Sequence, residues 1–164
     1  MEMCVAGTRI TQEGVDSMET KNQDRISELV EKQKDTYTSM ADEIWGYAEP
    51  RFQEYESSRV QQEYLASRGF SIRADLAGEK TAFIAEWGSG KPVLAFLGEF
   101  DALSSLQQEA DCTERRPIAG KTDGHGCGHH LLGTASVAAV DALKSYMEEK
   151  DLKDYMDLII LKLL

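Results

Sequence analysis

Cysteine is scarce in this sequence, and its scarcity limits the class of protein that the chain can belong to. The 164 residues hold three cysteines, at positions 4, 112 and 127. This odd, sparse set argues against a disulfide framework and for a reducing compartment, with Cys4 and Cys112 expected to be inert thiols. The N-terminus lacks a basic start followed by an apolar core, so we expect no secretory signal. No apolar run approaches the roughly 20 residues that span a bilayer, and a soluble, cytoplasmic protein is expected.

Basic residues are also in the minority. Lysine and arginine number 18 against 29 aspartates and glutamates, which gives a net charge of −11. Such a surface repels nucleic-acid phosphates and anionic lipid heads, so neither partner is expected. Hydrophobic residues (41%) and charged residues (29%) occur in the proportions of an ordinary globular domain. The acids fall along the faces of predicted helices, which is typical of a solvated surface.

Two helices are predicted in the first half of the chain. From about residue 21, apolar residues recur at three- and four-residue steps until Pro50 ends the pattern. A second helix is expected from Tyr55 to Arg68, with Gly69 as its C-terminal cap. Residues 1–20 lack this periodicity and are expected to form a loose leader.

The second half of the chain predicts strands and one more helix. Two short apolar runs, 81–87 and 92–100, are separated by a "GSGK" turn, and the tail "DLIILKLL" (157–164) reads as another strand. The run 92–100 is apolar on both faces, as in a strand covered by helices on each side. A helix is expected from about 131 to 149. The alternation predicts an α/β fold.

The segment "GHGCGHHLLG" (124–133) contains all three histidines of the chain. It follows a polar stretch of about twenty residues, and loops of that length are often functional. Cys127 and His129 are two positions apart, so in extended backbone their side chains share one side and can share a metal ion. Thiolate and imidazole suit zinc, and imidazole also suits manganese. The alternatives are a surface loop with incidental histidines and a redox-active thiol at Cys127.

Carboxylates follow the second predicted strand, in "GEFDAL" (98–103). The carboxyl edge of an α/β sheet is where functional sites are built. Asp101 could accept a hydrogen bond from a ligating imidazole and fix its tautomer, or could merely cap the next turn. Glu99 is a weaker candidate.

Three segments, "AEPRFQEYESSR", "LAFLGEFDAL" and "GHGCGHHLLGTASVAA", resemble in order and spacing the N-terminal part of a metallopeptidase family. This is the aminoacylase/carboxypeptidase group (clan MH, family twenty), in the amidohydrolase branch typified by p-aminobenzoyl-glutamate hydrolases. The resemblance covers roughly residues 40–145. It implies a catalytic domain with a central, mostly parallel sheet flanked by helices, two divalent metal ions, and hydrolysis of an amide that joins an acyl group to an amino acid.

Carried over by position, the resemblance implies roles for particular residues. Cys127 and His129 match metal ligands, and Asp101 matches the aspartate that orients the site. His125 matches a residue usual two positions before the cysteine, whereas His130 stands where the family has Asp or Asn. Ser104 is a second departure, where proline is usual. With Glu99, His125 and His130 are expected around the ligands.

The family continues into a segment that supplies a general-base glutamate, further ligands and an inserted dimerisation domain. The sequence stops before these, so residues 21–164 are expected to form only the N-terminal portion of the catalytic domain, and its last strand is expected to expose an apolar edge. The function predicted is metal-dependent hydrolysis of N-acyl amino acids, aminobenzoyl-glutamate-like conjugates or dipeptides, with zinc or manganese, in what is a homo-oligomer in the intact family. The alternatives are a catalytically incomplete fragment or truncated isoform and, ranked last, a small structural zinc module.

Overall fold

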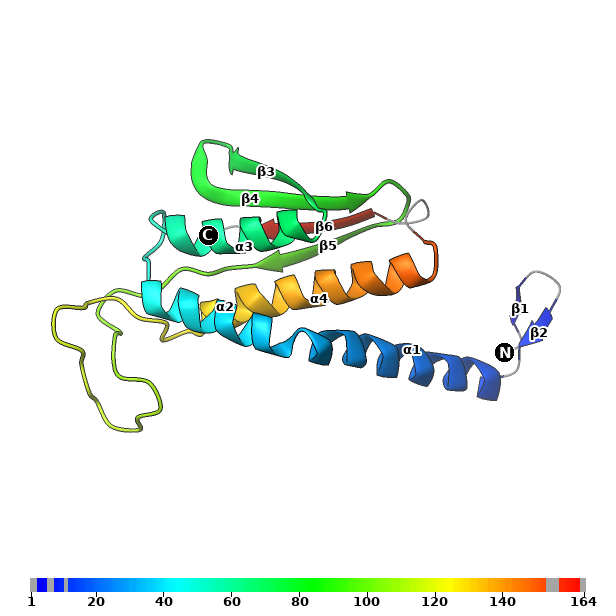
Figure 1. Ribbon diagram of the computed structural model, residues 1–164, viewed down its shortest axis with the longest axis horizontal. Coiled ribbons are helices and arrows are strands. Elements are labelled where there is room, and N and C mark those ends of the chain that lie inside the picture. Colours follow the sequence, from blue (N-terminus) through cyan, green and yellow to red (C-terminus); the bar gives the residue numbers. More distant parts are fainter. Residues whose placement is uncertain (1–2, 6–7, 11, 153–156, 163–164) are drawn as a thin grey trace.

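The computed structural model describes residues 3–5, 8–10, 12–152 and 157–162. It contains a short hairpin of β1 (Met3–Val5) and β2 (Thr8–Ile10), followed by helices and a four-stranded sheet (Figure 1). Helix α4 (His129–Glu149) lies against the sheet, and α1 (Gln12–Lys32) and α2 (Lys34–Tyr47) pack along α4. None of the described helices has the length and apolarity needed to cross a membrane.

The helix predicted from residue 21 to Pro50 is two helices. Gln33, with φ −108° and ψ 10°, separates α1 from α2, and the left-handed Ala48 ends α2. Helix α1 begins at Gln12, inside the predicted leader, so residue 20 is not an element boundary. The division of the chain into a leader and a catalytic portion stays a prediction. Helix α3 (Tyr55–Ser67) ends one residue before the predicted Arg68, which caps it, and Gly69 follows with φ +86°.

The sheet has the strand order β3–β4–β6–β5. Strands β3 (Ser71–Leu76) and β4 (Glu79–Gly88) are antiparallel, β4 and β6 (Asp157–Lys162) are antiparallel, and β6 is parallel to β5 (Val93–Gly98). The α/β class is confirmed, but the expectation of a mostly parallel sheet is wrong for these strands.

Connection lengths explain the mixed sheet. Ala77 and Gly78, both with positive φ, form a two-residue turn between β3 and β4, and such a turn joins only antiparallel neighbours. Parallel pairing needs a long crossover, which α4 provides between β5 and β6. Because β6 lies between β4 and β5, the expectation that the last strand forms an exposed edge is also wrong. The edge strands are β3 and β5.

One hydrophobic core lies between the helices and one face of the sheet. Phe83, Ala85 and Trp87 alternate along β4 and pack with Leu65 of α3 and Val137 of α4. These helices therefore share one face of the sheet.

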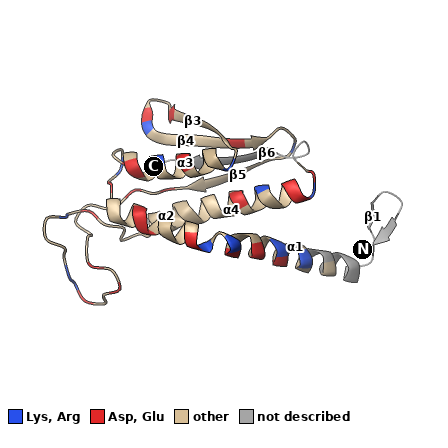
Figure 2. Ribbon diagram, viewed as in Figure 1, with Lys and Arg blue, Asp and Glu red and all other residues tan. Residues whose placement is uncertain are grey.

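Strand β5 is only half covered. Phe96 packs against the core, but Val93 and Leu97 are 48% and 63% exposed on the opposite side. The expectation that β5 is covered by helices on both faces is wrong within the described residues, because the helices pack on one face. Figure 2 shows that charged residues crowd α1, as expected for a solvated helix face.

Candidate metal site

Three potential metal ligands meet where β5 leads toward α4. Glu99 and Asp101 follow the end of β5, and His129 is the first residue of α4. The Nδ1 atom of His129 lies 2.7 Å from Asp101 Oδ1, and its Nε2 lies 3.3 Å from Glu99 Oε2. The ligand atoms of the three residues lie within 4.8 Å of one another. The structure places Asp101 beside the His129 imidazole, and the role of His129 as a metal ligand stays a prediction.

Backbone hydrogen bonds hold the three motif segments together at this point. Ala102 N–H donates to Glu49 O at 2.8 Å, which joins the "GEFDAL" segment to the loop between α2 and α3. Leu103 and Gly124 exchange two backbone hydrogen bonds, 2.9 and 3.0 Å long, which join the same segment to the histidine loop. The segments that carry the sequence resemblance are therefore neighbours in space.

Gly124 is required for this approach. A Cβ atom added to it would lie 2.5 Å from the backbone oxygen of Leu106, closer than real contacts allow. The buried Gly124 thus permits the long polar loop and the histidine loop to cross at contact distance.

Cys127 is placed differently from the prediction. The chain from His125 to Gly128 is a turn, with Gly128 N–H donating to His125 O at 3.1 Å and Gly128 left-handed at φ +73°. The argument from extended backbone is therefore wrong for Cys127 and His129. Cys127 is exposed, and its sulfur does not join the group formed by Glu99, Asp101 and His129. Ligation by Cys127 stays a prediction.

His125 and His130 form a separate buried cluster with Trp45. Their ring centroids are 4.7 Å apart, and the His130 ring meets Trp45 edge-on at 5.1 Å. His125 Nε2 lies 3.1 Å from Ile44 O, which can only accept, so Nε2 carries the proton and ties the loop to α2. Both Nδ1 atoms are buried and have no hydrogen-bond partner among the described residues. Burial lowers the pKa of His125 and lowers that of His130 to about 4, so both are neutral at pH 7.

Sequence reasoning undervalued two acids. Glu99 was placed around the ligands, but it faces the imidazole nitrogen that Asp101 leaves free. Glu54 is fully buried and accepts a hydrogen bond from Thr81 Oγ1 at 2.8 Å. Burial chiefly raises the pKa of Glu54, and the charge of Asp101 adds to this effect. The only signal for Glu54 was its place in the "AEPRFQEYESSR" segment.

The donor set fits a divalent cation. Imidazole nitrogen and carboxylate oxygen suit zinc and manganese, and a histidine ligand commonly donates its other N–H to a carboxylate, as His129 can to Asp101. The described residues contain one such group of three.

Known proteins resemble the chain in both sequence and fold. It is 43% identical over 124 residues to a subunit of the p-aminobenzoyl-glutamate hydrolase of Escherichia coli, covering 76% of this chain and 26% of that protein. It is 36% identical over 95 residues to IAA-amino acid hydrolase ILR1-like 6 of Arabidopsis thaliana, covering 57% of this chain and 19% of that protein. The chain thus spans about a quarter or less of these relatives' length. No protein-family model matches it.

Two solved structures share the fold. A protein of methicillin-resistant Staphylococcus aureus described as an aminohydrolase superposes with a TM-score of 0.67, at 20% identity, over 86% of this chain and 34% of that chain. A dinuclear metal-binding peptidase of the M20 family from Bacillus subtilis gives a TM-score of 0.55, at 20% identity, over 79% of this chain and 35% of that chain. By sequence and by fold, the chain corresponds to the N-terminal portion of an M20-type amidohydrolase, as the sequence resemblance predicted.

Proposed function

We propose that this chain supplies part of the metal site of an amide hydrolase. The observation that carries the proposal is His129, whose Nδ1 is held at 2.7 Å by Asp101 while its Nε2 faces Glu99. In this role Asp101 accepts a hydrogen bond from Nδ1–H and so fixes the tautomer that leaves the Nε2 lone pair free for a cation. Glu99 and His129, with the thiolate of Cys127 from the adjacent turn, would hold the ion.

A bound divalent cation would polarise the scissile carbonyl and make a water molecule more acidic. The residues of this chain would position that ion and fix the orientation of the His129 ring. Zinc and manganese both suit the donor set, and thiolate ligation by Cys127 would favour zinc.

The substrate class we propose is small amide conjugates of amino acids, including N-acyl amino acids, aminobenzoyl-glutamate-like conjugates and dipeptides. It is supported by the names of the two curated relatives, which are hydrolases of such conjugates. The net charge of −11 agrees with a small-molecule substrate rather than a nucleic acid. A cytoplasmic location and a homo-oligomeric enzyme are further parts of the proposal.

One observation also favours a second possibility, a partial site without turnover. Hydrolysis with two metal ions needs more ligands and a general base within hydrogen-bond reach. The described residues bring together one group of three ligands, and the other two histidines are buried with Trp45.

Metal content and turnover, measured on the same preparation, separate these possibilities. About two ions per chain with hydrolysis of p-aminobenzoyl-glutamate would support a complete hydrolase. One weakly held ion without turnover would support the partial site. Unfolding of the chain by a chelator would instead indicate a structural zinc module. A chain that binds no divalent ion and hydrolyses no amide would refute the proposal.

A further inference from the structure

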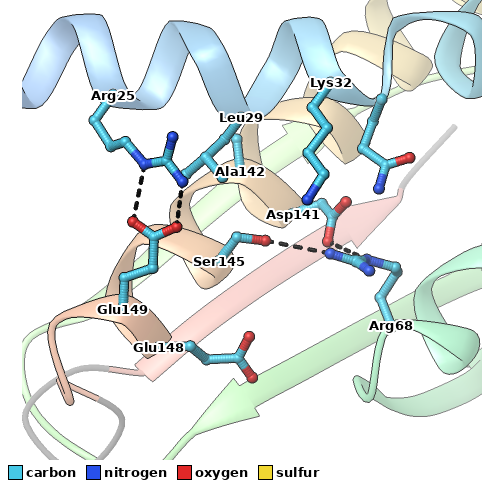
Figure 3. A pocket seen from close by; sticks show the side chains of 10 residues that line it. Arg25, Leu29, Lys32, Arg68, Asp141, Ala142, Ser145, Glu148 and Glu149 are labelled. Atoms are coloured by element: carbon cyan, nitrogen blue, oxygen red, sulfur yellow. Dashed lines mark hydrogen bonds and ion pairs between the residues drawn. The ribbon is translucent and has the colours of Figure 1, made fainter.

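A polar cavity lies toward the C-terminal end of α4 (Figure 3), whereas the candidate metal ligand His129 is the first residue of that helix. It has a volume of about 430 Å³, is open to solvent, and is lined by side chains from α1, α4 and the end of α3. The proposed metal site makes no use of these residues.

An ion pair between the buried Asp141 and the partly exposed Arg68 lines the cavity. Asp141, which is 1% exposed, accepts hydrogen bonds from the hydroxyls of Tyr37 (2.9 Å) and Tyr64 (2.7 Å) and from Arg68 Nε (2.7 Å). Both oxygens of its carboxylate therefore have donors within the chain. Arg68 also donates from Nη2 to Ser145 Oγ at 3.2 Å, so the guanidinium is fixed in place with further N–H groups left over.

The other acids of the cavity have cations of their own. Glu149 receives two hydrogen bonds from Arg25, 3.0 and 2.6 Å long, as Figure 3 shows. Glu148 is paired with Lys144 at 2.6 Å. These carboxylates are therefore already neutralised by partners within the chain.

Several side-chain N–H donors of the cavity, in contrast, lack an acceptor within it. Lys32 extends from α1 toward the Asp141–Arg68 pair, and Figure 3 draws no hydrogen bond or ion pair from its ammonium to the other residues that line the cavity. The side-chain oxygen of Gln33 accepts a hydrogen bond from Thr36 Oγ1 at 3.4 Å. Its amide N–H groups have no acceptor among the residues that the structure describes. Lys32, Gln33 and Arg68 thus bring unused N–H donors to one cavity.

We propose that this cavity binds a phosphate-type oxyanion, either inorganic phosphate or the phosphoryl group of a small molecule. Lys32 and Gln33 approach from the junction of α1 and α2, and Arg68 approaches from the end of α3. Donors that converge from different directions match a tetrahedral oxyanion better than a planar carboxylate. The arginine fork and the ammonium are the groups that proteins use for phosphate. The cavity volume leaves room for a small organic group beside the anion.

The test is calorimetric titration of the full chain with inorganic phosphate, glycerol 3-phosphate or acetate, each at matched ionic strength. A chelator removes metal ions, so that the anion cannot bind at Glu99 and His129. Lys32→Gln should weaken phosphate binding about tenfold, and Gln33→Met several-fold, because each removes one free donor. Lys34→Gln is the matched control, since this exposed lysine is paired with Glu31 at 2.9 Å outside the cavity. It should change the dissociation constant less than twofold.

The titrations either support phosphate binding in this cavity or overturn it. Tighter binding of glycerol 3-phosphate than of phosphate supports a phosphorylated small molecule, and the reverse supports inorganic phosphate. Acetate binding as tightly as phosphate, no heat beyond that of chloride, or full affinity in both Lys32→Gln and Gln33→Met would overturn the proposal. Circular dichroism of the variants shows whether they are folded, and the two substitutions are independent of each other.

Discussion

The His129 imidazole has a carboxylate at each nitrogen, and Asp101 is the closer of the two. We expect Asp101→Asn to weaken the binding of a divalent cation by about 10- to 100-fold, because the amide no longer fixes the ring orientation and tautomer. Calorimetric titration with zinc measures this loss.

Asp111→Asn is the matched control. Asp111 is exposed in the polar loop with φ +55°, a conformation that asparagine also tolerates. It should bind zinc like the unsubstituted chain. Equal affinity in Asp101→Asn and Asp111→Asn would show that Asp101 does not position the ligand.

Burial of the His130 imidazole should make the stability of the fold depend on pH. Its pKa in the folded protein is about 4, well below the ordinary value of 6.5, chiefly because of burial and secondarily because of His125. Between these values the unfolded chain binds a proton that the folded chain excludes. The free energy of unfolding therefore falls as the pH drops below 6.5, by roughly 2 kcal/mol between pH 7 and 5.

Urea unfolding at pH 7 and pH 5 measures this dependence. In His130→Asn the side chain cannot titrate, so the loss between the two pH values should shrink by about that amount. An unchanged loss in His130→Asn would mean that another group is responsible.

The sequence offered two roles for Asp101, partner of an imidazole or cap of a turn, and the structure shows the contact with His129, because a strand end and a helix start bring these positions together. The sequence could not place Cys127, because Gly126 and Gly128 allow a turn where extended backbone was assumed. Nor could it rank Glu99, since the direction of its side chain depends on how β5 leads into the loop.

At the scale of the elements, the crossing of two loops at Gly124 is the most demanding contact. Gly124→Ala would place a methyl group against the Leu106 backbone, and we expect it to lower the free energy of unfolding by about 1–3 kcal/mol and to weaken zinc binding. Gly46→Ala is the control, because Gly46 lies in α2 with open space around it, and should stabilise the helix by about 0.5–1 kcal/mol. Thermal unfolding compares the two, and a neutral Gly124→Ala would contradict the close approach.

Element boundaries were predicted well where the apolar period is strong. Helix α3 and strands β4 and β5 lie where the pattern indicated. Strand β3 was missed because most of its residues are exposed and show no alternation, and its existence depends on pairing with β4. The break at Gln33 was missed because the apolar period continues across it.

For the whole molecule, the open face and edge of β5 predict self-association. Val93 and Leu97 present apolar side chains beside the unpaired edge of this strand. Leu97→Glu should lower the fraction of oligomer seen by light scattering during gel filtration. Ser104→Glu adds the same charge in an exposed loop and should leave that fraction unchanged. An oligomer that persists equally in both variants would show that the chains do not associate through β5.

The α/β class followed from the alternation of elements, but the strand order did not. Sequence patterns describe each strand alone, whereas the place of β6 between β4 and β5 depends on pairing across more than sixty residues. The side on which the helices pack was likewise hidden, because an apolar strand looks the same whether one face or both are covered.

The most direct test of the proposed metal site is titration with cobalt, followed by absorption spectroscopy. We expect a sulfur-to-cobalt charge-transfer band that is lost in Cys127→Ser and kept in Cys112→Ser, whose thiol lies in the polar loop. We also expect weaker cobalt binding in Glu99→Gln. Absence of the band in the unsubstituted chain, or its persistence in Cys127→Ser, would contradict the account.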